Sequence, residues 1–229
     1  KLCIMVHSGS RNFGYKVAKY YNNKAKELNE KWSPTVPREY DLAFLKIDSE
    51  IAKEYISWMT LALEFARENR EVMLNVVKKH LLKIIPSIEF KNEVNAHDNY
   101  AAKEHHYGKK VWVHRKGAIR AREGEMGIIP GAMGSYSYIV KGKGNPESFN
   151  SCSHGAGRKL GRQQAKKQFH VEKTIADLKE LGVILGKQNK RDVSEESRFA
   201  YKDIDFVISQ ELDLIEPIKK LKTIAVIKG

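Results

Sequence analysis

Residues 129–158 read IPGAMGSYSYIVKGKGNPESFNSCSHGAGR, a run in which short apolar pieces alternate with turns of Gly, Ser, Asn and Pro. Most of this run belongs to a longer region, residues 86–157, that is rich in Gly, His, Ser and Asn and predicts several short β-strands. On both sides of it, apolar residues recur at helical spacing. We therefore expect an α+β fold.

The flanking regions contribute mainly helices. The elements expected there are, in chain order, a strand over 2–6, a helix over 13–32, a loop over 33–40, a helical segment over 48–85, a basic helix over 158–179, a helix over 201–212 and a strand over 222–228. The 48–85 segment is either one long helix or two helices joined near residues 67–70. It contains no reactive cluster, so we assign it a scaffolding role inside a single domain over residues 1–229.

Composition narrows the class of protein. The 229 residues include 41 Lys and Arg against 28 Asp and Glu, a net charge of +13 that favours a polyanionic partner, although a basic solvated surface is an equally common reading. Two cysteines, Cys3 and Cys152, argue against a disulfide framework. We find neither a membrane-length apolar stretch nor a secretory signal, and expect a cytoplasmic protein without a membrane partner. Because the chain starts at Lys1, we expect that something precedes it.

Four polar motifs are candidate site segments, each with an ordinary structural reading beside the functional one. VHSGSR, residues 6–11, places a possible metal-ligating His after an apolar run, and NAHDNY, residues 95–100, offers oxygen and nitrogen ligands suited to Mn or Zn. WVHRKGA, residues 112–118, predicts a phosphate site if the chain turns after His114. IPGAMGSYS, residues 129–137, predicts a backbone anion nest. The structural alternatives, in the same order, are a hydrogen-bonded His, a surface turn, a solvated charge run and a tight turn.

The strongest motif is SCSHGAGR, residues 151–158. His154 stands beside small residues at the expected start of a basic helix, where backbone N–H groups and the helix dipole stabilise phosphate. A neutral, sterically open imidazole can act as a nucleophile on phosphorus, and the neighbouring glycines supply that openness. A structural His packed by glycines is the competing interpretation.

In this order, VHSGSRNFG, NAHDNYAAKEHHYG, VWVHRKGAIRAREGE, IPGAMGSYSYIV, SCSHGAGR, AYKDID and the terminal KG resemble the RtcB RNA ligase family. The resemblance implies a mixed fold with short β-strands around a central active site and peripheral helices. It also implies an enzyme that uses GTP and Mn²⁺ to join RNA 2′,3′-cyclic phosphate or 3′-phosphate ends to 5′-hydroxyl ends through a histidine–GMP intermediate. The family's roles are tRNA splicing and RNA repair, so the implied partners are tRNA halves or broken RNA and an archease-like activator.

Residue by residue, the resemblance implies that His154 is guanylylated and that His7 ligates manganese. The residues it places at GTP are Asn99, Pro130, Gly131, Ala132, Met133, Ser137, Gly155, Ala156, Gly157, Tyr201 and Lys228. On charge grounds, we expect Arg115, Lys116 and Arg158 to contact phosphate or RNA.

The chain departs from the family pattern at several positions. Asp98 replaces a metal-binding His, so the ligand is either Asp98 or the adjacent His97, and Ala132 removes a hydroxyl from the Gly-rich loop. The family's DVGCG-like and Asn-His-Phe metal motifs lie N-terminal to the first motif here, and this chain contains neither. The leading hypothesis is a ligase whose competence needs an N-terminal portion. The alternatives are an RNA- or nucleotide-binding remnant and, more weakly, a metal-dependent phosphohydrolase.

Overall fold

The computed structural model describes residues 1–32, 37–187 and 192–228, and they form an α+β protein, as predicted. The chain divides into two compact units, residues 1–92 and 93–229, each of which is described by itself. The single domain over residues 1–229 stays a prediction. No helix in the described ranges is both long enough and apolar enough to cross a bilayer.

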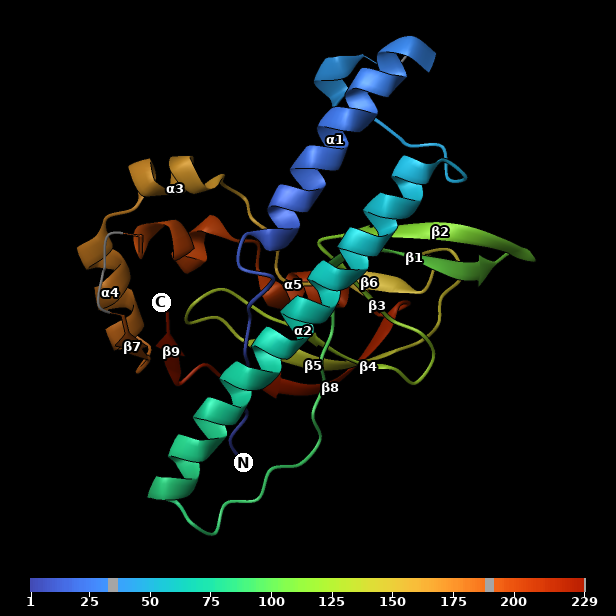
Figure 1. Cartoon of the computed structure of the whole chain (residues 1–229). Helices are drawn as coiled ribbons and strands as arrows, with labels where there is room; N and C mark the ends of the chain where they lie inside the picture. The colour runs from blue at the N-terminus through green and yellow to red at the C-terminus, as the bar shows by residue number, and fades with distance from the viewer. Residues whose placement is uncertain (33–36, 188–191, 229) are drawn as a thin grey trace. The chain divides into compact units, whose positions relative to one another are not determined.

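The first unit is built on two helices, α1 (Phe13–Trp32) and α2 (Glu50–Ile84), with a short 3-10 helix, η1 (Arg38–Tyr40), between them. The α1 prediction is confirmed, and the 48–85 segment is one continuous helix rather than two (Figure 1). Ser49 begins α2 as its N-cap, since its side chain accepts a hydrogen bond from the backbone N–H of Ala52. Residues 33–36 of the predicted loop lie outside the described residues.

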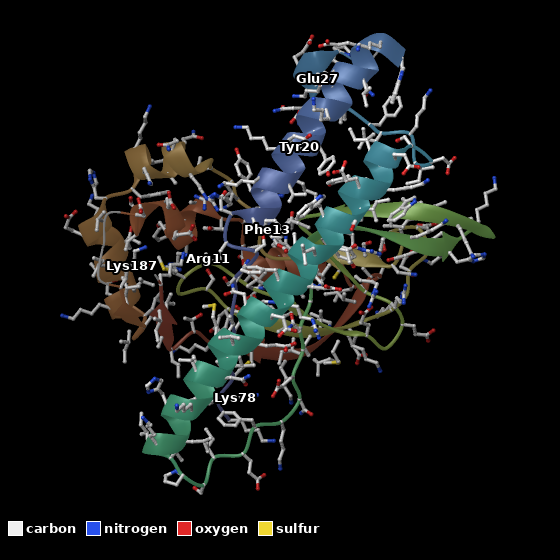
Figure 2. The ribbon with its side chains drawn as sticks, viewed as in Figure 1. Arg11, Phe13, Tyr20, Glu27, Lys78 and Lys187 are labelled. Carbon is white, nitrogen blue, oxygen red and sulfur yellow. The ribbon has the colours of Figure 1, made fainter. Side chains whose placement is uncertain are left out.

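The two helices pack through small and aromatic side chains. Tyr21, Ala25 and Asn29 are buried on α1 at a spacing of four residues, which places them on one face of the helix. Phe13, at the start of α1, contacts the rings of Trp58 and Phe65 edge-on, with 6.1 Å between ring centroids in each pair. Figure 2 shows where Phe13 lies on α1.

The predicted strand over residues 2–6 is wrong. These residues have no regular secondary structure, because no described strand pairs with them and an isolated strand leaves its backbone hydrogen bonds unmade. The turn that follows is instead held by α2: Asn69 donates to Ser8 Oγ and to the Gly9 carbonyl, both at 3.0 Å. Helix α2 therefore holds the segment just after His7, and its wider scaffolding role stays a prediction.

All strands in the described residues belong to the second unit, where they form four small sheets; Figure 1 labels them. They are β1 (Asn99–His106), β2 (Lys109–Lys116), β3 (Ala118–Arg120), β4 (Met126–Ile129), β5 (Ser137–Gly142), β6 (Ser151–Ser153), β7 (Ile184–Gly186), β8 (Ile215–Leu221) and β9 (Ala225–Ile227). The antiparallel pairs are β1 with β2, β3 with β6, and β5 with both β4 and β8, while β7 and β9 are parallel. Strand β8 was not predicted, and the predicted terminal strand is limited to β9.

The predicted helix over residues 158–179 is two helices, α3 (Arg162–Gln168) and α4 (Val171–Glu180). The first turn expected at Arg158 does not form, because the N–H groups of Lys159 and Leu160 bond to the Ala200 carbonyl, while Arg158 bridges to Tyr201. The helix expected over residues 201–212 is shorter, α5 (Ile204–Ser209), and follows the 3-10 helices η2 (Ser194–Glu196) and η3 (Arg198–Ala200).

The main core of the second unit lies directly beneath the His154 segment. Cys152 and Ala156, on either side of His154, are 4% exposed and belong to a cluster of buried apolar residues. The other buried members are Ile119, Ala121, Ile129, Tyr138, Val140, Ile204, Ile208 and Ile215. Packing of a native core restricts side-chain and backbone freedom, so these two anchors fix the path of the short loop that carries the imidazole.

Candidate active site around His154

His154 follows β6, and it does not start a helix as predicted. Strand β6 is paired with β3 on one side, and the backbone N–H and hydroxyl of Ser153 donate to the Glu211 carboxylate at 3.0–3.2 Å. Because the nearest helix, α3, begins only at Arg162, the helix-dipole argument for phosphate binding at His154 does not hold. The position of the imidazole depends on strand pairing and core packing instead.

The His154 side chain has a defined hydrogen bond at one nitrogen. Nδ1 lies 2.7 Å from the Gly117 carbonyl oxygen, which can only accept, so Nδ1 carries the proton in the neutral ring. The lone pair is then on Nε2, which lies 3.8 Å from Asp98 Oδ2. The His154 side chain as a whole is 34% exposed. Of the two ring nitrogens, Nε2 is therefore the one with a free lone pair in the neutral ring.

Asp98 is the member of the NAHDNY motif that lies beside His154. Its backbone carbonyl accepts from Gly117 N–H at 2.8 Å, which joins the start of β1 to the turn after β2. The Asn99 side-chain oxygen also accepts from Gly117 N–H, at 3.3 Å. His97 packs against the edge of the Tyr100 ring, 6.0 Å between centroids. Asp98 therefore places a carboxylate beside the His154 imidazole.

The Gly-rich loop contacts the His154 segment through backbone atoms. The Pro130 carbonyl accepts from Ala156 N–H at 3.1 Å, and a Cβ at Gly155 would stand 3.1 Å from the same oxygen. At Gly131 a Cβ would meet the Tyr136 carbonyl oxygen at 1.9 Å, so only glycine allows the loop to close.

Several side chains predicted to contact GTP are buried instead. Ala132, Met133, Ser137 and Ala156 are each 8% exposed or less. Met133 packs in a second core cluster with Leu178, Val183 and Val193, and Ser137 Oγ accepts from Gly131 N–H at 3.1 Å. These side chains shape the loop, so any direct contact with a nucleotide falls to the backbone and the more exposed positions.

Arg115 does not lie where its predicted RNA contact requires. Strand β2 runs on to Lys116, so Arg115 and exposed Lys116 point to opposite faces, and the expected turn after His114 comes only at Gly117. The Arg115 side chain is 1% exposed and pairs with Glu104 through both terminal nitrogens, at 2.7 and 3.1 Å. Its Nε donates to Ser151 Oγ at 2.9 Å. Arg115 is a buried support for the segment that leads to His154, and we do not assign it to RNA.

The Glu196 carboxylate brings together three residues from the sequence predictions: Arg158, Tyr201 and Lys228. Tyr201 donates to Glu196 at 2.7 Å, Lys228 Nζ lies 3.1 Å from it, and the Arg158 guanidinium lies over the Tyr201 ring at 4.6 Å. Burial raises the pKa of Glu196, but the Tyr201 hydrogen bond and the charges of Lys228 and Arg158 outweigh it and hold that pKa below its usual value. Burial and the bond to Glu196 raise the pKa of Tyr201 to about 12, so its hydroxyl stays a donor.

Metal-ligand candidates are dispersed in the part of the chain that the structure describes. Residues 1–32, 37–187 and 192–228 contain no group of three or more His, Cys, Asp and Glu side chains close enough to hold a metal ion. His7 is exposed in the first unit. Both cysteines are free, and burial raises the pKa of Cys152 to about 12, which disfavours the thiolate that a metal ligand requires.

Comparison with known proteins assigns the sequence to a family. The family model described as tRNA-splicing ligase RtcB matches residues 1–229. The chain belongs to the RtcB family. It is 40% identical to the RNA-splicing ligase RtcB of Escherichia coli (strain K12) over 232 residues, 99% of this chain and 56% of that protein. It is 35% identical to the tRNA-splicing ligase RtcB of Nanoarchaeum equitans, across 100% of this chain and 52% of that protein. The chain thus spans about half the length of these relatives.

Within this RtcB chain, Glu196 and Gly117 are the site residues that sequence reasoning missed. Glu196 lies in the run SEES, residues 194–197, which carries no motif, and only its position among three polar partners distinguishes it. The sequence makes a turn at Gly117 plausible. The run HRKG, residues 114–117, cannot show that the carbonyl at its end selects the His154 tautomer.

Gly117 supports a direct prediction. Its φ is +67°, and an added Cβ would lie 3.2 Å from Cε1 and 3.3 Å from Nδ1 of His154. We expect Gly117→Ala to destabilise the protein by about 1–2 kcal/mol through left-handed backbone strain. It should also shift the ring away from the Gly117 carbonyl. Urea unfolding measures the first effect, and ¹⁵N NMR of the His154 ring nitrogens measures the second.

The matched control is Gly108→Ala, in the turn between β1 and β2. Gly108 has a similar φ of +73°, but an added Cβ there meets nothing within 4 Å. This variant should lose comparable stability while the His154 nitrogen shifts stay unchanged. Unchanged His154 shifts in Gly117→Ala would contradict the assigned contact.

Proposed function

We propose that this chain carries the guanylylation centre of a GTP- and Mn²⁺-dependent RNA ligase acting in tRNA splicing or RNA repair. The reaction would join RNA 2′,3′-cyclic phosphate or 3′-phosphate ends to 5′-hydroxyl ends. One observation carries the proposal: the Gly117 carbonyl, 2.7 Å from His154 Nδ1, keeps the proton on that nitrogen and leaves Nε2 unprotonated and open. A nucleophilic imidazole needs that arrangement.

In the proposed first step, His154 Nε2 attacks the α-phosphate of GTP, an N–P bond forms, and the P–O bond to pyrophosphate breaks. The ring becomes positively charged, and the hydrogen bond from Nδ1–H to the Gly117 carbonyl strengthens as it does so. At a 2′,3′-cyclic end, water would first open the cyclic phosphate to a 3′-phosphate. The guanylate then passes from Nε2 to the RNA 3′-phosphate. The 5′-hydroxyl loses its proton and attacks that phosphate, so a phosphodiester bond forms and GMP leaves. His154 returns to its neutral tautomer.

Residues around His154 would bind and orient the nucleotide. The backbone of Pro130, Gly131, Gly155 and Gly157 lies in or beside the loop contact with the His154 segment. Tyr201 and Lys228 are held in place by Glu196, and Lys228 retains 34% exposure. We assign them to GTP, with Asn99, and retain Lys116 and Arg158 as candidate RNA or phosphate contacts.

The residues present fit a manganese ion in part. Asp98 offers a carboxylate beside the His154 imidazole, and carboxylate oxygens suit Mn²⁺. We assign Asp98 to the metal in preference to His97, and His7 stays a predicted ligand. When bound, Mn²⁺ would offset the negative charge of the triphosphate. An archease-like activator, a requirement for an N-terminal portion and a cytoplasmic location also stay predictions.

Covalent labelling tests the proposal. Incubation of the chain with GTP labelled at the α-phosphate and MnCl₂ should give an acid-labile label on the peptide that contains His154. The same incubation is repeated with an added polypeptide carrying the family's DVGCG-like and Asn-His-Phe motifs. GTP labelled at the γ-phosphate is the control and should leave the protein unlabelled. Absence of label in both incubations, with RNA binding intact, would favour the binding-remnant alternative.

A further inference from the structure

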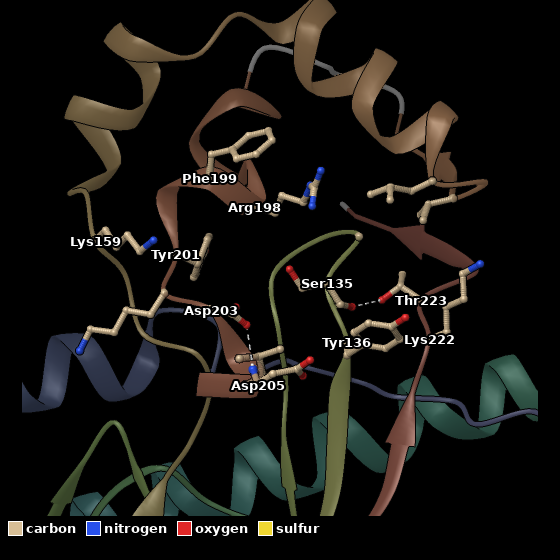
Figure 3. A pocket seen from close by; sticks show the side chains of 15 residues that line it. Ser135, Tyr136, Lys159, Arg198, Phe199, Tyr201, Asp203, Asp205, Lys222 and Thr223 are labelled. Atoms are coloured by element: carbon tan, nitrogen blue, oxygen red, sulfur yellow. Dashed lines mark hydrogen bonds between the residues drawn. The ribbon is translucent and has the colours of Figure 1, made fainter. Parts of the chain in front are cut away.

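The second unit contains a cavity of about 400 Å³ that shares only Tyr201 with the residues proposed to bind GTP. It is bounded by residues 134–136, by the segment from Arg198 to Asp205, and by Lys159, Lys222 and Thr223 among others (Figure 3). Tyr201 lines it, but His154 and Lys228 are not among its described lining residues. The cavity therefore neighbours the His154 site through Tyr201 and is separate from the reacting nitrogen.

Two large aromatic rings lie exposed at this cavity. Phe199 is 55% exposed and Tyr136 is 42% exposed, and both line the space (Figure 3). A cation covers part of each ring: the Arg198 guanidinium lies 4.6 Å from the Phe199 centroid, and Lys220 Nζ lies 4.1 Å from the Tyr136 centroid. Exposed aromatic rings next to cations are the usual means of stacking an unpaired base.

The charge at the cavity is positive. Lys159, Lys202 and Lys222 are exposed there, and within the described ranges none of their ammonium groups forms an ion pair. The lining carboxylate of Asp205 is already paired with Lys220, at 2.5 Å. The remaining lining carboxylate, Asp203, accepts from the backbone N–H of Asp205 at 2.9 Å. Among the described lining residues, three ammonium groups without an ion pair therefore face one carboxylate without a cation. This excess of positive charge favours the binding of phosphate.

We infer that this cavity binds one unpaired nucleotide of an RNA strand, with the base at Phe199 and Tyr136 and the adjoining phosphates at Lys159, Lys202 and Lys222. Proteins recognise single-stranded RNA by stacking splayed bases on aromatic and Arg groups, whereas a duplex keeps its bases stacked on each other. The volume is within the range of about 300–1,000 Å³ that holds small ligands. The choice of RNA rests on the proposed function.

Phe199 gives the sharpest test, because it is exposed and its loss leaves the cores intact. Binding of a short fluorescent single-stranded oligoribonucleotide with a 3′-phosphate is measured by anisotropy over a range of salt concentrations. Phe199→Ala should weaken binding by about ten-fold without changing the salt dependence, since stacking is not ionic. Phe199→Trp should restore affinity. Equal affinity of Phe199→Ala and the unaltered chain, or no binding by the unaltered chain, would overturn the inference.

The lysines are tested together as Lys159→Gln/Lys202→Gln/Lys222→Gln. This variant should bind more weakly, and the slope of log affinity against log salt should fall by about 0.7 for each phosphate that the protein no longer neutralises. The control, Lys103→Gln/Lys109→Gln/Lys110→Gln, removes the same charge from exposed positions on β1 and β2 that do not line the cavity. An equal loss of affinity in both triple variants would show general electrostatic attraction and overturn the site.

Free GTP offers the same base and phosphate chemistry as an RNA nucleotide, so GTP forms a second arm of the test. His154 labelling by GTP should be unchanged in Phe199→Ala. A drop in labelling with unchanged RNA affinity would assign the cavity to GTP and overturn the inference. Failure of the proposed function appears differently, as absence of label on His154 in the unaltered chain while the RNA measurements still respond to Phe199.

Discussion

Replacing His154 with Asn is expected to abolish covalent labelling by GTP, leaving no signal above background. Removal of a covalent nucleophile costs about 10⁶ in kcat in well-studied hydrolases, far more than loss of a positioning contact. Asn is the chosen replacement because its amide N–H can take the place of Nδ1–H and still donate to the Gly117 carbonyl, while nothing replaces Nε2. Gel autoradiography after incubation with α-labelled GTP and MnCl₂ measures the effect.

His105→Asn is the matched control for this experiment. His105 is an exposed imidazole on β1 that takes no part in the His154 site. This variant should be labelled as strongly as the unaltered chain. Both variants should unfold at similar urea concentrations, since His154 lies at the surface of its loop. Persistent labelling of His154→Asn would mean that another residue is the nucleophile and would refute the proposed centre.

Replacing Arg115 with Met is expected to destabilise the second unit by about 3–5 kcal/mol, because it leaves Glu104 buried without its cation. Both side chains are 3% exposed or less, and the pair is bidentate. Arg115 also donates to the Phe149 carbonyl at 2.9 Å, and Phe149 and Asn150 both have positive φ, 54° and 51°. Urea unfolding followed by circular dichroism measures the loss of stability.

Two control variants distinguish the effect of burying an unpaired charge from the effect of losing an ion pair. Arg120→Met breaks another bidentate pair, with Glu125, whose side chains are 36% and 29% exposed, and should cost about 1 kcal/mol or less. The double variant Arg115→Met/Glu104→Met removes both buried charges and should recover most of the stability. Equal losses of stability in Arg115→Met and Arg120→Met would contradict the role given to burial.

The loss of folding stability caused by Arg115→Met should also depend on pH. Burial raises the pKa of Glu104, but the bonds from Arg115 and His106 and the charge of Arg115 outweigh it and hold that pKa at about 2, below the ordinary 4.5. A depressed carboxyl pKa stabilises the folded state above about 4.5, and this contribution is lost as the pH falls toward 2. Arg115→Met lacks this contribution at every pH. The difference in stability between the two proteins should therefore shrink as the pH drops below about 4.5.

The accuracy of the sequence predictions follows from how local each determinant is. The helices over residues 13–32 and 50–84 were predictable because amphipathic spacing and the Ser49 cap act within a few residues. Residues 2–6 have the composition of a strand, but a strand needs a partner that composition does not supply. The helical turn predicted at Arg158 does not form for a related reason: the backbone groups there hydrogen-bond to Ala200 and Tyr201, which are distant in the sequence.

The distinction between local determinants and contacts across the chain also applies to the site. The sequence alone determined the family, the α+β class and His154 as the residue to test, because ordered motifs and residue chemistry are visible in one dimension. Only the tertiary structure decided that Gly117 selects the Nε2 lone pair, that Arg115 is buried against Glu104, and that Asp98 stands beside the imidazole. Each of these depends on contacts between residues far apart in the chain, and such contacts exist only once strands pair and the core closes over them.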